Sequence, residues 1–192
     1  LVQYLQMDKA KQSKIKDVGG FVGGYFATNG RRKKEGLIGR TVVTLDADNV
    51  KKDSNIWEGF KATFSFAACI YSTHKHTEEA PRLRIIIPLA DSTNVEQYEA
   101  VARYIADKIG MEYFDPTTFQ ASRLMFWPST PKDVDFFFDW QDGEILDPEE
   151  ILKKYKDWKD VSSWPMHKSE TPEAILNNKR KAPDPTAKAG IV

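Results

Sequence analysis

The sequence predicts an α+β fold whose central unit has the order strand, helix, strand, strand, helix, strand (βαββαβ), as in ferredoxin-like and RNA-recognition-type (RRM) proteins. Three observations lead to this prediction. Short β-branched and aromatic runs alternate with two segments of helical periodicity. The longer of these segments has capping residues before it and a glycine after it. The chain has 192 residues and is 41% hydrophobic, which suits one packed core with additions rather than two full domains.

The first half of the unit follows from the pattern of apolar residues. A largely apolar run over 42–45 leads to Asp46 and predicts the first strand. An amphipathic segment over 55–63 predicts the first helix. The β-branched and aromatic run 66–74 then predicts the second strand.

The second half of the unit has clearer boundaries. Residues 82–87 alternate and then become apolar, so they predict a third strand that we expect Pro88 to end, because proline cannot donate to a sheet ladder. A helix follows from cap-type residues near Asn94, and it ends at Gly110. The run 122–127 predicts the fourth strand, again closed by a proline.

The flanks of the unit differ from it in composition. Residues 1–36 are basic and rich in glycine, so we expect short strands or a hairpin packed on the core. The core domain is predicted over 37–156, and it includes an extra strand over 134–140 and a helix over 148–155. Residues 157–192 have the composition of a tail or linker.

Charge, cysteine content and hydropathy place the chain among soluble proteins. Its 28 basic and 28 acidic residues cancel, so any nucleic-acid surface must be a local patch. Cys69 lies in an apolar run and is expected to be a core residue of a protein in a reducing compartment. No segment could span a membrane and no leader is visible, so we expect a cytoplasmic protein without a membrane partner. Because the chain begins at Leu1 and ends in a polar stretch, we expect it to be a piece of a longer polypeptide.

Carboxylates gather at one edge of the predicted sheet. Asp46 and Asp48 share one face at the end of the first strand, because side chains alternate along a strand. Asp115, in a Phe-Asp-Pro sequence before the fourth strand, reaches the same edge in this topology. Such oxygen ligands favour magnesium or manganese over zinc. The alternatives are a solvated strand end for the first two residues and an ordinary Asp-Pro turn for the third.

Cationic and polar side chains are predicted at the same edge. Ser72 and His74 end the second strand, Arg82 and Arg84 begin the third, and Arg123 begins the fourth. Arginine on an exposed strand is commonly just solvated. Three arginines that converge on carboxylates form the arrangement that a metal-bound triphosphate requires.

The spacing of these residues resembles a family. Asp46-x-Asp48, Ser72-x-His74 and Phe114-Asp115 are similar to the three motifs of archaeo-eukaryotic-type primases, the primase-polymerase superfamily with an RRM-like catalytic core. The fuller sequences around Pro81-Arg82-x-Arg84 and Ser122-Arg123 resemble the prophage and plasmid branch, at the front end of virulence-associated-E-type replication proteins. The resemblance covers roughly 19–140.

The resemblance implies template-directed nucleotidyl transfer, as a DNA primase or DNA polymerase in the replication of a phage, prophage or plasmid. Asp46, Asp48 and Asp115 would be the catalytic residues, holding two Mg²⁺ or Mn²⁺ ions. The incoming dNTP or NTP would be held by residues of the second to fourth strands: Ser72, His74, Arg82, Arg84 and Arg123.

The resemblance also implies partners. The template would be single-stranded DNA or a primer-template, and we assign its contact to the basic segment Arg31, Arg32, Lys33 and Lys34, with the lysines of 9–16 as the alternative path. Relatives usually continue into a helicase domain. No Gly-x-x-x-x-Gly-Lys phosphate loop and no zinc-binding cysteine cluster occurs in this sequence, so any helicase lies outside the chain.

Two other function classes compete with this interpretation. A rolling-circle or relaxase (HUH) endonuclease would use His74 and His76 for metal and Tyr98 or Tyr104 as nucleophile, although Lys75 does not suit the middle of that motif. A non-catalytic RRM-like module would bind a single strand by stacking bases on strand aromatics.

Overall fold

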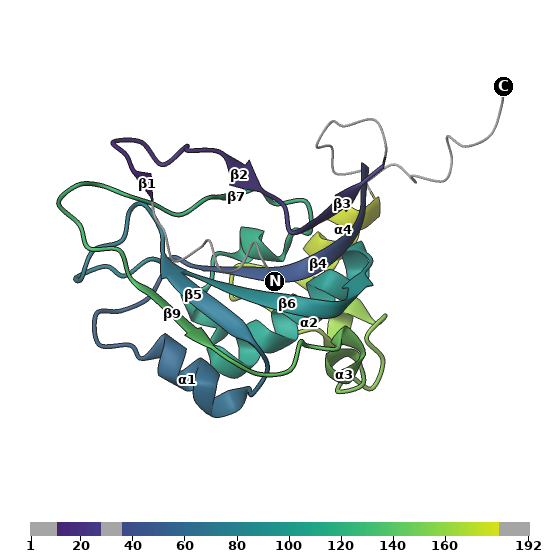
Figure 1. Ribbon diagram of the computed structural model, residues 1–192. Coiled ribbons are helices and arrows are strands. Elements are labelled where there is room, and N and C mark those ends of the chain that lie inside the picture. Colours follow the sequence, from purple (N-terminus) through teal and green to yellow (C-terminus); the bar gives the residue numbers. More distant parts are fainter. Residues whose placement is uncertain (1–10, 28–35, 181–192) are drawn as a thin grey trace, which may run out of the picture.

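The computed structural model describes residues 11–27 and 36–180, and Figure 1 shows how their elements are arranged. The strands are β1 (Lys11–Gln12), β2 (Gly20–Phe21), β3 (Gly24–Phe26), β4 (Leu37–Ala47), β5 (Ala68–Ser72), β6 (Leu83–Thr93), β7 (Met125–Phe126), β8 (Ser129–Thr130) and β9 (Phe138–Gln141). The α-helices are α1 (Ile56–Thr63), α2 (Val95–Ile109), α3 (Pro148–Leu152) and α4 (Pro172–Arg180). Short 3₁₀ helices are η3 (Met111–Tyr113), η4 (Pro116–Phe119) and η5 (Val161–Ser163).

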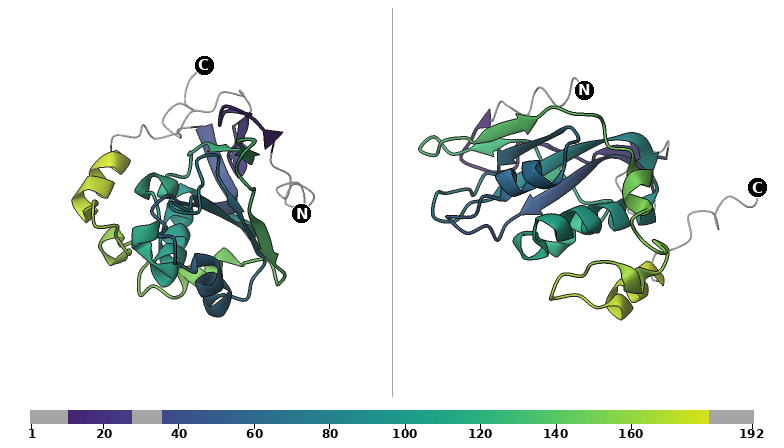
Figure 2. Two further views of the ribbon diagram at one scale, coloured as in Figure 1. Left: turned by 90° about the vertical axis from the view of Figure 1, so that its left-hand side faces the viewer. Right: turned by 90° about the horizontal axis from the view of Figure 1, so that it is seen from below.

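The main sheet of the described residues has the strand order β3-β4-β6-β5-β9. The strand β6 runs antiparallel to both β4 and β5, so β4 and β5 are parallel to each other. This is the order and direction that the first three strands of a ferredoxin-like unit take. Figure 2 shows α1 and α2 on one face of this sheet, with the β2 and β7 segments on the other. The α+β fold class is confirmed.

The predicted fourth strand lies elsewhere. Only Met125–Phe126 forms a strand, β7, and it pairs with β2 instead of joining the main sheet. The edge of β4 is occupied by β3 over residues 37–40 and by the side chain of Thr118 further along, so no partner position remains for β7. The later strand β9 extends the sheet at its other edge, beside β5. The expected N-terminal extension does contain short strands, β1 to β3.

Pro88 does not end its strand, contrary to the prediction. The strand β6 continues to Thr93, and Pro88 lies opposite Val42 at an irregular part of the β4 pairing. The strand β5 pairs with β6 only as far as Ile86. Pro88 therefore lies where the ladder on the β5 side has ended, and its missing N–H removes no bond there.

The alternation along β4 separates two packed layers. Val43, Leu45 and Ala47 are fully buried under the helices, as the period of two predicts. The opposite face of the sheet carries a smaller apolar cluster that includes Cys69 and Tyr71. Helix α2 begins at an Asn94 capping box and ends at Gly110, whose φ of 132° favours glycine.

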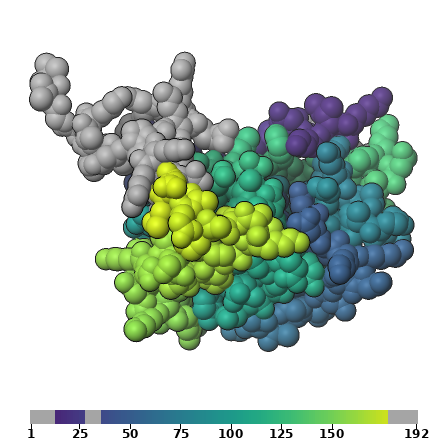
Figure 3. Space-filling view, turned by 180° about the vertical axis from the view of Figure 1, so that it is seen from behind, coloured from purple at the N-terminus to yellow at the C-terminus, as the bar shows by residue number. Residues whose placement is uncertain are grey.

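Residues 157–180 pack behind α2, which differs from the expected tail. Trp164 and Ile175 belong to the main core, and Arg103 of α2 is bonded to both Glu99 and Glu170. Figure 3 shows this C-terminal segment in yellow and light green across the teal surface of α2. The rest of the predicted tail, residues 181–192, lies outside the described residues. Among the helices that the structure describes, none has the length and hydropathy needed to cross a bilayer.

Candidate active site

A cavity of about 270 Å³ lies between the main sheet and the segments that carry β1, β7 and β8. Three carboxylates line it: Asp46, Asp48 and Asp115. Six basic side chains also line it: Lys16, His74, Lys75, Arg82, Arg84 and Arg123. The structure thus brings together every predicted metal ligand and four of the five predicted nucleotide-binding residues.

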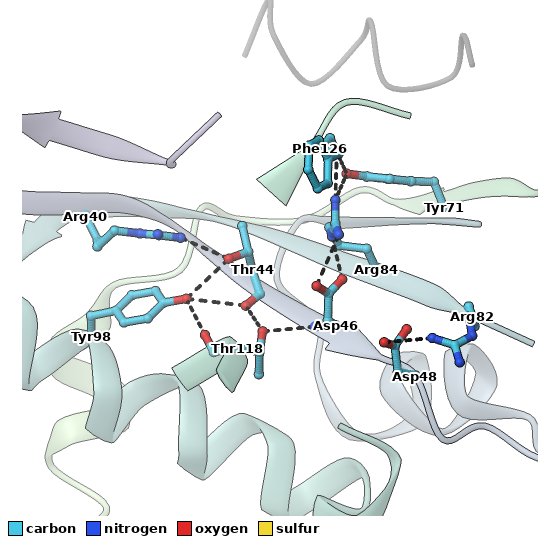
Figure 4. A network of polar contacts seen from close by, with 10 residues as sticks. All are labelled: Arg40, Thr44, Asp46, Asp48, Tyr71, Arg82, Arg84, Tyr98, Thr118 and Phe126. Carbon is cyan, nitrogen blue, oxygen red and sulfur yellow. Dashed lines mark hydrogen bonds and ion pairs between the residues drawn. The ribbon is translucent and has the colours of Figure 1, made fainter. Parts of the chain in front are cut away.

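The loop that carries Asp115 is bonded to the open edge of β4. The backbone N–H of Asp115 donates to the carbonyl oxygen of Asp46 at 2.9 Å. The hydroxyl of Thr118 donates to the carbonyl oxygen of Thr44 at 2.8 Å and accepts the N–H of Asp46 at 3.0 Å. These bonds take the place of a neighbouring strand and fix Asp115 beside Asp46. Figure 4 shows the two bonds of Thr118.

A buried polar network supports this loop from the other side. The guanidinium of Arg40 donates to the hydroxyl of Thr44 at 3.0 Å and to the carbonyl of Ala121 at 2.8 Å. The hydroxyl of Tyr98 lies 3.3 Å from the carbonyl oxygens of Thr44 and Thr118. Burial lowers the pKa of Arg40. The sequence analysis missed this network, although Arg40 and Thr44 share the strand face of Asp46 by the period of two.

Arg84 holds Asp46 in a buried, two-pronged ion pair (Figure 4). Its Nε lies 2.6 Å from Oδ1 of Asp46 and its Nη2 lies 3.1 Å from Oδ2. Its Nη1 donates to the hydroxyl of Tyr71 at 3.1 Å and to the carbonyl of Phe126 at 2.7 Å. Burial acts to lower the pKa of Arg84, but Tyr71 and Asp46 raise it overall. Every nitrogen of this guanidinium is therefore already bonded, which differs from the predicted role in holding a triphosphate.

Asp48 forms a second ion pair, which is more exposed. Its Oδ2 lies 2.9 Å from Nη1 of Arg82, and the two side chains are 34% and 37% exposed. Burial raises the pKa of Asp48, and the neighbouring Asp46 raises it further, while Arg82 lowers it. The carboxylates are therefore close enough to repel one another.

The remaining cations face the cavity with few competing partners among the described residues. The Nδ1 of His74 lies 3.1 Å from the hydroxyl of Ser129. The Nζ of Lys16 lies 5.2 Å from the ring centre of Phe126. Lys16 and Lys75 were not among the predicted nucleotide-binding residues, although Lys16 belongs to the basic run 9–16. Both are available to bind an anionic ligand.

One predicted nucleotide-binding residue, Ser72, lies elsewhere. Ser72 does not line the cavity, because its hydroxyl is buried and accepts the N–H of Phe137 at 2.9 Å. Its role is to hold the segment before β9. The basic segment 31–34 lies outside the described residues.

The carboxylates suit a hard divalent cation in their chemistry. Asp46, Asp48 and Asp115 supply oxygen donors, and the raised pKa of Asp48 reflects in part a repulsion that a cation would relieve. Within 11–27 and 36–180, however, no three Asp, Glu, His or Cys side chains stand close enough together for a ready metal site. The donor set fits the ion, and closing it around an ion requires side-chain movement.

The competing functions find less support in the geometry. Tyr98 is fully buried in the polar network, and Tyr104 packs against Tyr155 on the helical side of the sheet. Neither tyrosine lines the cavity that contains His74. Tyr71, on the face of the sheet that points away from the helices, is also fully buried and offers no stacking surface to a base.

Comparisons with known proteins agree with this geometry. A family model described as the VapE N-terminal domain matches residues 1–167. Among solved structures, the AEP domain of the primase-polymerase (PrimPol) of cyanophage S-2L is similar, with a TM-score of 0.50 and 14% sequence identity over 70% of this chain and 68% of that chain. At this identity the likeness shows a shared fold. No curated protein matches the sequence.

Proposed function

The chain belongs to the VapE N-terminal domain family, related to the primase-polymerases as its motifs predicted, and from this premise we propose that it is a template-directed nucleotidyltransferase. The family and the shared fold support an enzyme of DNA replication. The single observation that carries the finer proposal is the cavity in which three carboxylates face Lys16, Lys75 and Arg123.

The side chains divide the chemistry between them. Asp46, Asp48 and Asp115 would hold two divalent ions, Mg²⁺ or Mn²⁺. When bound, such ions favour the deprotonated 3′-hydroxyl of a primer and neutralise the charge of the departing pyrophosphate. Arg84 is a positioning residue, because its two bonds to Asp46 orient that carboxylate from behind.

The phosphates of a dNTP or NTP would bind the cationic side chains that remain. Arg123, Lys16 and Lys75 offer charge, and His74 donates from the ring nitrogen that Ser129 does not contact. We propose single-stranded DNA or a primer-template as the other substrate, with 31–34 as its contact. A helicase domain in the same full-length polypeptide would supply the unwound strand.

The direct test is incorporation of labelled nucleotides on a single-stranded template, with Mg²⁺ or Mn²⁺ and with or without a primer. Asp115→Asn and Asp48→Asn are expected to abolish incorporation while the protein stays folded, because both side chains are at least partly exposed.

The matched control is Asp139→Asn in β9. The Oδ2 of Asp139 accepts the indole N–H of Trp57 at 2.7 Å, and asparagine keeps an acceptor there. This variant is expected to remain active. An active Asp115→Asn protein together with an inactive Asp139→Asn protein would show that the third carboxylate is misassigned.

A further inference from the structure

Two arginines at the start of β6 meet two aspartates at the end of β4, but the two pairs differ in how firmly they are held. Arg84 and Asp46 lie within these strands, whereas Arg82 comes just before β6 and Asp48 just after β4. Arg84 is 8% exposed and makes four hydrogen bonds to three partners. Arg82 is 37% exposed, and its ion pair with Asp48 is the single side-chain bond that the described residues give it. The first pair is built into the fold, whereas the second can open at little cost, since exposed ion pairs contribute about 0–1 kcal/mol.

The Arg82 pair also occupies a proposed metal ligand. The guanidinium lies 2.9 Å from Oδ2 of Asp48, on an oxygen that a cation would need. The same guanidinium lines the cavity with Arg123 and Lys75, where the triphosphate would lie. Arg82 therefore stands between a carboxylate and the place of an anionic ligand, and it can bond to one or the other.

The charge of the cavity shows when this exchange is favourable. Five Lys and Arg side chains and three carboxylates line it, so its formal charge is positive with histidine neutral. A divalent cation alone enters against that charge and must compete with Arg82 for Asp48. A cation that arrives with a triphosphate brings an anionic acceptor for the guanidinium that it displaces.

We propose that Arg82 is an exchangeable counter-ion, which neutralises Asp48 in the empty site and transfers to the triphosphate when nucleotide and divalent cation bind together. The inference rests on the proposed function and adds a rule of loading: metal and nucleotide bind cooperatively. Because binding free energies are linked, each ligand raises the affinity for the other by the same factor.

The experiment measures Mn²⁺ affinity from the electron paramagnetic resonance signal of the free ion, first alone and then with a non-hydrolysable deoxynucleoside triphosphate. The variants are Arg82→Gln and, as matched control, Arg123→Gln. Both variants remove one positive charge from the same cavity. Of these two arginines, Arg82 is the one that contacts a carboxylate among the described residues. Thermal melting confirms that each variant is folded.

We expect Arg82→Gln to bind Mn²⁺ alone about fivefold or more tightly than wild type, because Asp48 is then free. The same variant should lose most of the enhancement that the triphosphate gives to Mn²⁺ binding. Arg123→Gln should weaken triphosphate binding, gain less Mn²⁺ affinity and keep more of the enhancement.

The two possible failures are distinguishable. If the triphosphate binds but Arg82→Gln matches Arg123→Gln in Mn²⁺ affinity and in enhancement, the exchange is refuted and the proposed function stands. If wild type binds no triphosphate with Mn²⁺ present, the proposed function fails, and the exchange fails with it.

Discussion

Replacing Arg84 by methionine tests whether this residue belongs to the fold or to the nucleotide site. The change removes two bonds to Asp46 and leaves that carboxylate, which is 16% exposed, without its counter-charge. It also removes the donor to Tyr71 and Phe126. Breaking a buried ion pair by deleting one partner costs about 3–5 kcal/mol. We add no separate cost for the lost hydrogen bond to the Phe126 carbonyl, because this range already includes a loss of that size. We expect the free energy of unfolding to fall by about 4 kcal/mol.

The assay is unfolding in urea, monitored by tryptophan fluorescence. The dependence of the free energy of unfolding on urea concentration is compared between the variants. Arg82→Met is the matched control, since its pair is exposed and should contribute no more than about 1 kcal/mol. Adding Asp46→Leu to Arg84→Met should recover part of the loss, because no uncompensated charge remains. A loss below about 1 kcal/mol for Arg84→Met would refute the reasoning. It would favour the role predicted from the sequence, in which Arg84 binds the triphosphate.

Three further predictions concern the neighbouring groups. Thr118→Val should destabilise the protein by about 1–3 kcal/mol and reduce nucleotide incorporation, because the N–H of Asp46 loses its acceptor. Thr117→Val, as the control, should be neutral or stabilising, because the Thr117 hydroxyl is buried without a partner among the described residues. Equal changes in melting temperature for the two variants would show that the bonds of Thr118 do not stabilise the loop. Asp48→Asn should raise the melting temperature at pH 7, because the raised pKa of the Asp48 carboxyl means that the folded state disfavours its charge. This gain should vanish as the pH falls through the pKa of Asp48, where the wild-type carboxyl becomes neutral too. A gain that persists at acidic pH would show that the charge of Asp48 is not its cause. Neutralising 31–34 should reduce the slope of log template affinity against log salt by roughly 0.7 per residue on a single strand, and an unchanged slope in fluorescence anisotropy would direct the search to the lysines of 9–16.

The parts of the fold that were predicted correctly depend on local patterns. The buried side of β4 follows from alternation, and the ends of α2 follow from Asn94 and Gly110. Asp46 and Asp48 meet in one cavity because they lie at the end of the same strand. Asp115 joins them as expected, but through the bonds of its loop to β4 and not through a fourth strand of the sheet.

The errors arise where a competition between partners decides the outcome. The hydroxyl of Thr118 bonds to the β4 edge that the fourth strand was expected to occupy. The periodicity of a strand does not predict that a side chain will bond to the backbone of a neighbouring strand. Alternation places Arg84 on the correct face but does not say that Asp46, Tyr71 and Phe126 bond to every nitrogen of its guanidinium. The packing of residues 157–180 depends on single contacts such as Arg103 with Glu170, which leave no periodic signal.

The most direct test of the central claim is whether the template chooses the nucleotide. The protein is incubated with Mn²⁺, a primer and one of four homopolymeric DNA templates, and each labelled nucleotide is offered separately. Our account predicts incorporation only of the nucleotide complementary to each template, and none by the Asp115→Asn protein. Incorporation of the same nucleotide on every template, or undiminished incorporation by Asp115→Asn, would contradict it.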